Sequence, residues 1–206
     1  MLEKELDITT EEKIKQAAKI VFHKKGFAAT RTRDIAEEAG INLALLNYYF
    51  RSKEKLFELI MEESLRDFLL SLTGVISDES TSLQEKIPLL VDRYITMLIS
   101  NRNMPIFILS EIHQNPELLV SKFQIKEIMM KSAFVLQFQD AVATGKIAQL
   151  NVFQFIMNLM GLIIFPFMVA PMLKQIGDLQ EEQFVALIME RKKLIPIWIE
   201  AILKKT

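Results

Sequence analysis

The chain has 206 residues, of which half are hydrophobic and a quarter are charged, and its formal net charge is −1. This length allows one core, or a small domain joined to a larger one, and the composition excludes a disordered or fibrous protein. Because the sequence contains no cysteine, disulfides, thiol nucleophiles and thiolate metal sites are excluded. Its first seven residues form no apolar segment, so we expect no signal peptide and a cytoplasmic location.

Residues 13–55 are the basic part of the chain, with ten Lys or Arg residues against four Asp or Glu residues. A local excess of positive charge is typical of a surface that binds nucleic acid, but a solvated helical surface can carry it as well. Charge alone therefore leaves both interpretations open.

The first predicted helix begins at Thr9, whose spacing to Glu12 fits a capping box. Apolar residues then recur at helical spacing, at Ile14, Ala17, Ala18, Val21 and Phe22. We expect Gly26 to end this helix, because glycine readily adopts the left-handed conformation found after helix ends.

Two short helices are predicted next. The first follows Thr32, a good N-cap, and ends at Gly40. Asn42 can cap the second, which covers residues 43–50.

Longer helices follow this pair. Ser52 can cap one that runs from residue 53 past residue 70. Further helices are predicted near residues 83–100, 105–114, 117–143, 151–174 and 180–205. No segment shows the sustained alternation of a strand, so the fold class we predict is all-α.

The two short helices match a helix-turn-helix, in which the second helix presents its exposed face to the major groove of DNA. On a helical projection of residues 43–50, Leu46, Tyr49 and Phe50 share one side and form a plausible core face. The opposite side is predicted to face DNA and contains Leu43, Ala44, Asn47 and Tyr48.

These exposed residues suit base readout. Asn47 can pair with adenine or bridge a phosphate, Leu43 and Ala44 can touch thymine methyl groups, and the Tyr48 hydroxyl can donate to a phosphate. The alternative is that Leu43 or Leu45 packs against a neighbouring helix.

Phosphate contacts are expected from cations beside helix starts. Arg31 and Arg33 flank the start of the second helix, where the dipole disfavours a cation unless an external anion is present. Lys53 follows the Ser52 cap and adds a cation to free backbone N–H groups. The caps Thr32 and Asn42 complete the predicted DNA-binding set.

Three segments of the sequence, GF at 26–27, TRTRDIAEEAGIN at 30–42 and LNYYFRSKEKL at 46–56, resemble the signature of the tetracycline-repressor (TetR) family. The resemblance covers roughly residues 10 to 60 and preserves the spacing of three helices. It implies an all-α homodimer with a helix-turn-helix at residues 31–50 and with Asn47, Tyr48 and Lys53 at usual DNA-contact positions.

The chain also departs from the family pattern. Ala44 and Leu45 stand where glycine or small polar residues are common, and Asn47 stands where tyrosine is common. The base preferences of the family therefore cannot be transferred. The domain division we expect is a DNA-binding domain at residues 1–52 and an effector-binding and dimerisation domain at residues 53–206.

Residues 152–173 are almost wholly apolar and nominally long enough to span a bilayer. Gln154, Asn158, two prolines and the lack of aromatic or basic flanks argue for a buried helix instead, and we expect no membrane partner. Pairing with the last helix across a two-fold axis would bury it, as the family resemblance implies. The predicted dimer interface comprises Phe155, Met160, Phe167, Phe184, Leu187, Leu194 and Trp198.

The remaining helices are rich in methionine and phenylalanine, which either fill a core or line an apolar pocket. A pocket for a small apolar or amphipathic effector is predicted from Tyr94, Met97, Phe107, Met130, Phe134, Phe138 and Asn158. The two histidines, His23 and His113, lie far apart and fit no metal-ligand spacing, so we expect neither metal nor cofactor.

The function these patterns favour is a sequence-specific DNA-binding regulator, a ligand-responsive repressor that acts as a homodimer on an inverted-repeat operator. An activator, or a regulator that needs its ligand to bind DNA, would share every feature. A membrane-associated or lipid-associated helical protein is a remote alternative. No catalytic triad, phosphate-binding glycine loop or metal cluster is recognisable, so we do not expect an enzyme.

Overall fold

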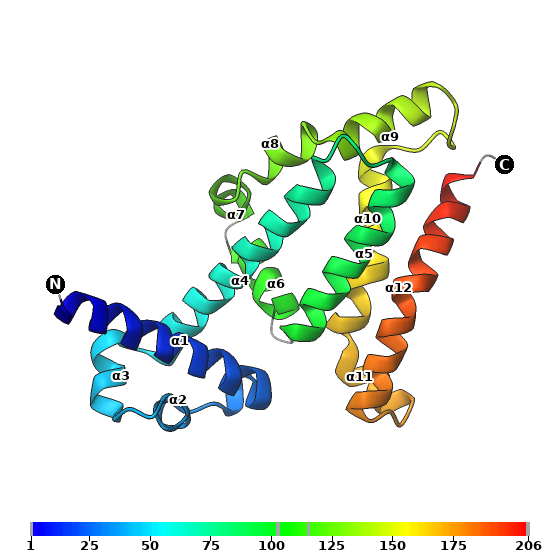
Figure 1. Cartoon of the computed structure of the whole chain (residues 1–206). Helices are drawn as coiled ribbons and strands as arrows, with labels where there is room; N and C mark the ends of the chain where they lie inside the picture. The colour runs from blue at the N-terminus through cyan, green and yellow to red at the C-terminus, as the bar shows by residue number, and fades with distance from the viewer. Residues whose placement is uncertain (1, 102–103, 115, 205–206) are drawn as a thin grey trace. The chain divides into compact units, whose positions relative to one another are not determined.

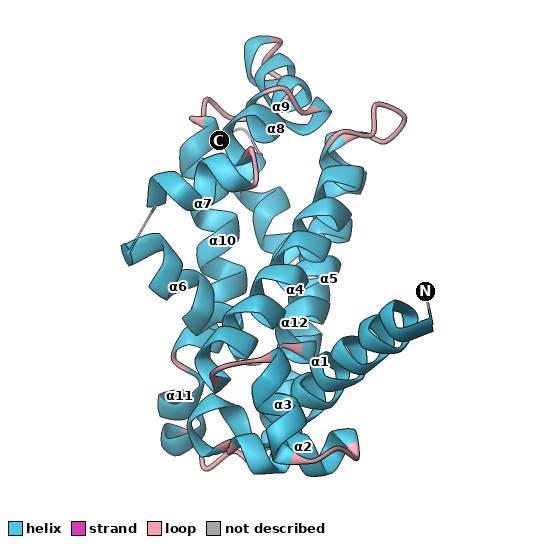
Figure 2. Ribbon diagram, turned by 90° about the vertical axis from the view of Figure 1, so that its left-hand side faces the viewer, coloured by secondary structure: helices cyan, strands magenta, loops and turns pink. Residues whose placement is uncertain are grey.

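The computed structural model describes residues 2–101, 104–114 and 116–204, except for the side chains of residues 2–9, 23, 110–111, 114 and 118. All regular structure in these residues is helical, and no strand occurs among them (Figure 2). The all-α prediction is confirmed. Figure 1 labels the helices in chain order.

The chain divides into two compact units. Unit 1 comprises Met1–Asp67 and Asn101–Met104, and unit 2 comprises Phe68–Ser100 and Pro105–Thr206. The domain boundary expected after residue 52 falls inside unit 1, at the start of a helix that continues without a break to Ile76.

Unit 1 contains α1 (Leu2–Ala29), α2 (Thr32–Ala39), α3 (Leu43–Tyr49) and the first part of α4 (Lys53–Ile76). The start predicted at Thr9 is wrong, because α1 is already helical from Leu2. Gly26 interrupts α1 as predicted, with a φ of 75° and a ψ of 165° that a side chain would disfavour.

The core of unit 1 is built from one apolar face of each helix. The predicted stripe of α1 is buried, and so are residues of the other three helices: Ile35, Ala36 and Ala39, then Leu46, then Leu56 and Ile60. An ion pair adds to this packing, because the Lys15 ammonium lies 2.9 Å from the Glu63 carboxylate of α4. The hydrogen bond to Glu63 raises the pKa of Lys15.

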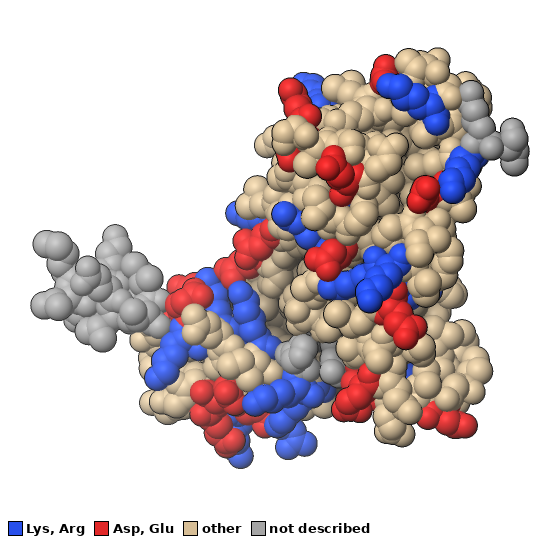
Figure 3. Space-filling view, turned by 45° about the vertical axis from the view of Figure 1, so that its right-hand side comes forward, with Lys and Arg blue, Asp and Glu red and all other residues tan. Residues whose placement is uncertain are grey.

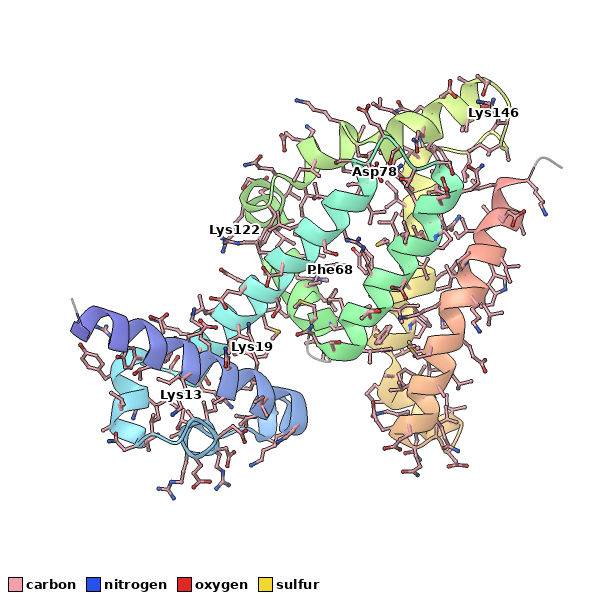
Figure 4. The ribbon with its side chains drawn as sticks, viewed as in Figure 1. Lys13, Lys19, Phe68, Asp78, Lys122 and Lys146 are labelled. Carbon is pink, nitrogen blue, oxygen red and sulfur yellow. The ribbon has the colours of Figure 1, made fainter. Side chains whose placement is uncertain are left out.

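The described residues of unit 2 form the end of α4 and eight further helices. Their bounds are α5 (Leu83–Ser100), α6 (Met104–Gln114), α7 (Pro116–Lys122), α8 (Ile125–Met130), α9 (Ala133–Ala143), α10 (Val152–Met168), α11 (Ala170–Ile176) and α12 (Glu181–Leu203). Helix α5 packs against α9, α10 and α12, and α10 also packs against α12. Phe68 near the middle of α4 points toward α5 (Figure 4), where its ring meets Tyr94 edge-on at 4.5 Å between centroids.

The single helix predicted at residues 117–143 is wrong, since the structure has three helices there. Gln124 adopts a left-handed backbone with a φ of 50°, which ends α7. Ser132 then caps α9, its hydroxyl accepting a hydrogen bond from the Val135 N–H at 3.3 Å. Neither the left-handed glutamine nor the serine cap interrupts the apolar periodicity of the sequence.

The helix predicted at residues 151–174 is also two helices, α10 and α11, bent by 66°. Pro171 fits a break here, because it has no N–H for the helical ladder and is tolerated in the first turn of a new helix. Among the described residues, no single helix is long and apolar enough to cross a membrane, although this bent pair would be by length and composition alone.

A second proline, Pro166, is accommodated inside α10. It has no N–H to donate to the carbonyl of Leu162, four residues earlier. The Arg191 guanidinium of α12 supplies the missing donor at 2.6 Å, and it also lies over the Trp198 ring at 5.1 Å. An inter-helix hydrogen bond thus replaces one that the proline removed.

Candidate nucleic-acid interface

The turn between α2 and α3 is closed by Gly40, which has a left-handed φ of 64°. Its N–H donates to the Glu37 carbonyl at 3.0 Å, and the N–H of Ile41 donates to the Ala36 carbonyl at 3.0 Å. These bonds satisfy the last carbonyls of α2 and set the direction in which α3 starts.

Asn42 caps α3 as predicted, because its side-chain oxygen accepts a hydrogen bond from the Leu45 N–H at 2.7 Å. The residue is exposed. Its carboxamide oxygen is therefore already engaged by the backbone, which leaves the NH2 group for any outside partner.

The two sides of α3 differ in burial. Leu46 and Phe50 are buried and Tyr49 is half-buried, which agrees with the predicted core face. The exposed residues of α3 are Ala44, Asn47 and Tyr48, of which Tyr48 is 76% exposed and stacks edge-on against Tyr49. Leu43 and Leu45 are half-buried, so both share in the packing of unit 1.

The start of α2 is fixed by Asp34 and not by Thr32. Arg31 is the N-cap residue, and its N–H donates to the Asp34 carboxylate at 2.9 Å, so the prediction of Thr32 as the cap is wrong. Lys25 lies 3.0 Å from the other carboxylate oxygen. The Arg31 N–H and then Lys25 lower the pKa of Asp34.

The arginines beside these helices point to solvent. Arg31 and Arg33 are exposed, as is Arg51 directly after α3, which the sequence analysis did not single out. Lys13 and Lys19 lie along α1 (Figure 4), and Lys and Arg side chains gather over the visible face of unit 1 among acidic ones (Figure 3). The local charge excess therefore lies on the surface.

Lys53 occupies a different setting from the one expected of a free phosphate ligand. Its ammonium donates to the carbonyls of Phe27 and Thr30, at 3.0 Å each, and lies 4.2 Å from the centre of the Phe27 ring. The side chain is half-buried. Sequence reasoning missed this arrangement, because the acceptors lie more than twenty residues earlier in the chain.

The predicted dimer interface needs correction at two positions. Phe155 and Phe184 are buried within unit 2, so they offer no surface to a second copy. Leu187, Leu194 and Trp198 are exposed, while Met160 and Phe167 are half-buried. The reason is that α10 and α12 are apolar on two sides, and periodicity did not separate the inner side from the outer side.

The predicted pocket residues also divide into buried and exposed ones. Met97, Phe107, Phe134 and Phe138 are buried, and burial raises the pKa of Tyr94 to about 12. Two others lie on the surface of unit 2 and outside this buried set, Met130 on a helix that buries no residue and Asn158 on the outer side of α10.

No group of three or more His, Cys, Asp or Glu residues that could hold a metal ion occurs among the described residues. His113 is exposed, with Nδ1 at 2.8 Å from the Leu109 carbonyl, and the His23 side chain lies outside the described residues.

Comparison with known proteins shows a family match for the segment that contains the helix-turn-helix. Residues 14–60 match the family described as "Bacterial regulatory proteins, tetR family". The probable HTH-type transcriptional regulator YttP of Bacillus subtilis (strain 168) is 27% identical over 205 residues, which are 97% of this chain and 96% of that protein.

Solved structures share the fold of the whole chain. A TetR transcription regulator from Haloarcula marismortui ATCC 43049 has a TM-score of 0.64 at 19% identity, over 95% of this chain and 99% of its own. The transcriptional regulator FadR of Bacillus subtilis, solved in complex with stearoyl-CoA, has a TM-score of 0.55 at 20% identity, over 89% of this chain and 96% of its own. The similarity thus extends well beyond the helix-turn-helix.

Proposed function

This chain belongs to the TetR family of DNA-binding transcriptional regulators, and from that premise we propose that it acts as a homodimer on an inverted-repeat operator. The observation that carries the proposal is the exposed side of α3, which follows a glycine-closed turn and lies between exposed arginines in sequence. An eight-residue helix followed by such a turn and a second short helix is the geometry that enters a major groove.

Base readout is assigned to the exposed residues of α3. Asn47 is the residue best suited to pair with adenine, and Ala44 suits a thymine methyl group. Tyr48 can donate its hydroxyl to a phosphate while the edge-on Tyr49 ring supports it. Leu43 contributes a smaller apolar surface because it is half-buried.

Phosphate contacts are assigned to exposed cations at the borders of this motif. Arg31 and Arg33 begin α2, and Arg51 follows α3. Each guanidinium can bind phosphate oxygens in a bidentate manner, and such contacts supply affinity without sequence preference. The NH2 group of Asn42 and the Thr32 hydroxyl are secondary candidates.

Homodimerisation is supported by apolar surface on α10. Phe153, Met157 and Phe165 are each 57% exposed, although α10 buries its opposite side. Gly161 continues the row of Phe153 and Met157 at a spacing of four residues, and a Cβ placed there would meet nothing within 4 Å. A glycine inside a helix costs about 1 kcal/mol relative to alanine, and close approach of a second copy explains why one is present.

The adjoining helix α12 presents a matching row, formed by Leu187, Leu194, Trp198 and Ile202. Arg191 lies within this row and reaches the Leu162 carbonyl of α10, so the rows on the two helices are neighbours. Its Nε is buried and has no hydrogen-bond partner among the described residues. A buried donor without a partner costs free energy, and an acceptor from a second copy would remove this cost. The interface we propose is the predicted one without Phe155 and Phe184.

The effector we propose is a small apolar or amphipathic molecule that binds in unit 2. Support comes from the aromatic interior, where the Phe155 ring lies 4.9 Å from the Phe138 ring and 5.9 Å from the Phe134 ring. The neighbour FadR holds stearoyl-CoA, which is itself amphipathic. Repression is the expected sign, because a dimer seated across more than a turn of DNA excludes other proteins from it.

The experiment that tests the proposed function is selection of random duplex DNA by the purified protein at moderate salt. We expect an enriched inverted repeat, with two half-sites related by the two-fold axis of the dimer. Release of that duplex by stearoyl-CoA or free stearate would support the effector class. A folded protein that enriches no sequence would contradict the proposal.

A further inference from the structure

Lys53, the first residue of α4, is held inside unit 1 by three contacts. Its ammonium donates to the Phe27 carbonyl and to the Thr30 carbonyl, at 3.0 Å each, and lies 4.2 Å from the centre of the Phe27 ring. A cation at the N-terminal end of a helix is disfavoured by the helix dipole. Two carbonyl oxygens and the face of an aromatic ring offset this cost.

The two carbonyls belong to the segment after the interruption of α1 at Gly26. Gly26 has a left-handed backbone, the helix then resumes and ends at Ala29, and residues 30–31 connect it to α2. The buried Thr30 turns its hydroxyl back to the Gly26 carbonyl at 2.7 Å. Lys53 thus supplies donors where the helical hydrogen-bond pattern ends.

These bonds join the two ends of the helix-turn-helix. Phe27 lies in the last turn of α1 and Thr30 in the connection to α2, whereas Lys53 begins α4, the helix that follows α3. The segment between them is closed into a loop by the ammonium group, and Phe57 packs against the Phe27 ring at 4.6 Å between centroids. The direction of α3 relative to α1 therefore depends on where Lys53 is held.

We propose that Lys53 is a positioning residue for the recognition helix and not a phosphate ligand. This inference rests on the proposed function, because it concerns how the α3 surface is presented to DNA. Two of its three N–H donors are taken by the carbonyls, and its side chain is half-buried. A phosphate would find only the one remaining N–H donor, on a side chain that the two carbonyls already hold in place.

The test compares Lys53→Met with Lys55→Met in the full chain. Methionine keeps a flexible apolar stem against the Phe27 ring but has no donor. Lys55 lies on the same first turn, is exposed, and loses the same charge. Each protein is measured well below its own unfolding temperature, against the selected operator and against an unrelated duplex, over a range of salt concentrations.

Lys53→Met is expected to weaken operator binding by roughly tenfold or more, the order of effect that loss of correct base readout has. Binding to the unrelated duplex and the salt dependence should stay as in the unmodified protein. Lys55→Met should leave the ratio of the two affinities unchanged. Equal loss on both duplexes by Lys53→Met, with a salt slope lowered by about 0.9, would make Lys53 a phosphate ligand.

Hydrogen exchange in the absence of DNA separates this inference from the proposed function. Amides of residues 27–34 should exchange faster in Lys53→Met than in Lys55→Met, because the two carbonyl bonds are lost. Unchanged exchange there would overturn the inference even if the operator is found. A lower unfolding temperature with an unchanged operator ratio would overturn it too, since the role would then be structural only.

Discussion

The exposed surfaces of the two units differ in their chemistry. In unit 1, the outer side of α3 presents Asn47 and Tyr48 close in sequence to exposed arginines, whereas in unit 2 the outer sides of α10 and α12 present phenylalanine, methionine, leucine and tryptophan. In Figure 3 Lys, Arg, Asp and Glu side chains are scattered over the visible face of unit 2 among uncharged ones. The polar and basic surface of unit 1 suits a polyanion, and the apolar surface of unit 2 suits a second apolar surface. We therefore assign DNA recognition to unit 1 and dimer assembly to unit 2.

The interiors of the two units, unlike their surfaces, share one kind of hydrogen bond. Both use a cationic side chain to satisfy carbonyls that have lost regular partners: Lys53 serves the segment after Gly26, and Arg191 serves the carbonyl that Pro166 leaves free. In unit 2 the buried Lys86 also donates to the carbonyls of Asp78 and Thr81, in the loop after α4 (Figure 4). The contrast between the units therefore lies at their surfaces.

The largest expected effect is that of Leu187→Glu on dimerisation. Each copy would bring an unpaired carboxylate into an apolar interface, which costs several kcal/mol, so the dimer dissociation constant should rise by about 100-fold or more. Sedimentation equilibrium measures it. The control is Met189→Glu, since Leu187 is 47% exposed and Met189 is 46% exposed.

At about 100° per residue, Met189 faces almost the opposite side of α12 from Leu187. Its substitution should therefore leave the dimer intact. If both variants stay dimeric, the apolar rows of α10 and α12 are not the interface. If both dissociate, the effect is not specific to the Leu187 side.

Asn47→Ala tests the polar surface of unit 1. Loss of a bidentate contact should change the preference at specific base pairs by about 1–3 kcal/mol, measured by competition with operators altered one base pair at a time. Gln16→Ala, an exposed polar change on α1, serves as the control. An unaltered preference in Asn47→Ala would mean that this side of α3 does not read bases.

A double-mutant cycle tests the pairing of Arg191 with the carbonyl freed by Pro166. Arg191→Met should lower the free energy of unfolding by about 1 kcal/mol, because the Leu162 carbonyl loses its donor. In a Pro166→Ala background the alanine N–H can satisfy that carbonyl, so the same change should cost less. Chemical denaturation of all four proteins gives the coupling, and additive effects would contradict the assigned role.

The smallest expected effect is the pH dependence that Asp34 gives to unit 1. Its pKa is lowered in the folded chain, first by the Arg31 N–H and then by Lys25. The contribution is therefore fully present above the unfolded value of about 3.9 and is lost as the pH falls through the folded pKa.

The stability advantage of the unmodified protein over Asp34→Asn should thus shrink as the pH falls from about 5 to about 3. Thermal unfolding at each pH measures it, with Glu38→Gln on the same helix as control. An advantage of constant size across this range would show that the Asp34 carboxylate is not what fixes the start of α2.

How far the sequence predicts the structure also differs between the units. In unit 1 the caps and stops are local signals, and Gly26, Gly40 and Asn42 all act at the predicted places. The start predicted at Thr9 is wrong, since α1 begins at Leu2. The displacement of the α2 cap from Thr32 to Arg31 reflects a competition that Asp34 decides through a backbone hydrogen bond. The hydrogen bonds of Lys53 could not be predicted from local signals, because their acceptors are distant in sequence.

In unit 2 the presence of helices was predicted, but the residues at which several of them end, and the side of each that is buried, could not be predicted as well. Apolar residues occupy both the buried and the exposed sides of α10, so periodicity could not place Phe155 inside and Met157 outside. Pro171 was a visible signal for the bend, whereas the left-handed Gln124 had none. The buried Lys86 also lacked a signal, since charge alone predicts a solvated side chain.

The central claim, that one unit reads DNA while the other pairs two copies, is tested most directly by the mass of the complex on a duplex carrying one selected site. Sedimentation should give two chains per duplex for the unmodified protein, with the two half-sites protected equally. A single chain bound with full sequence specificity would contradict the account, as would a dimer that protects only one half-site.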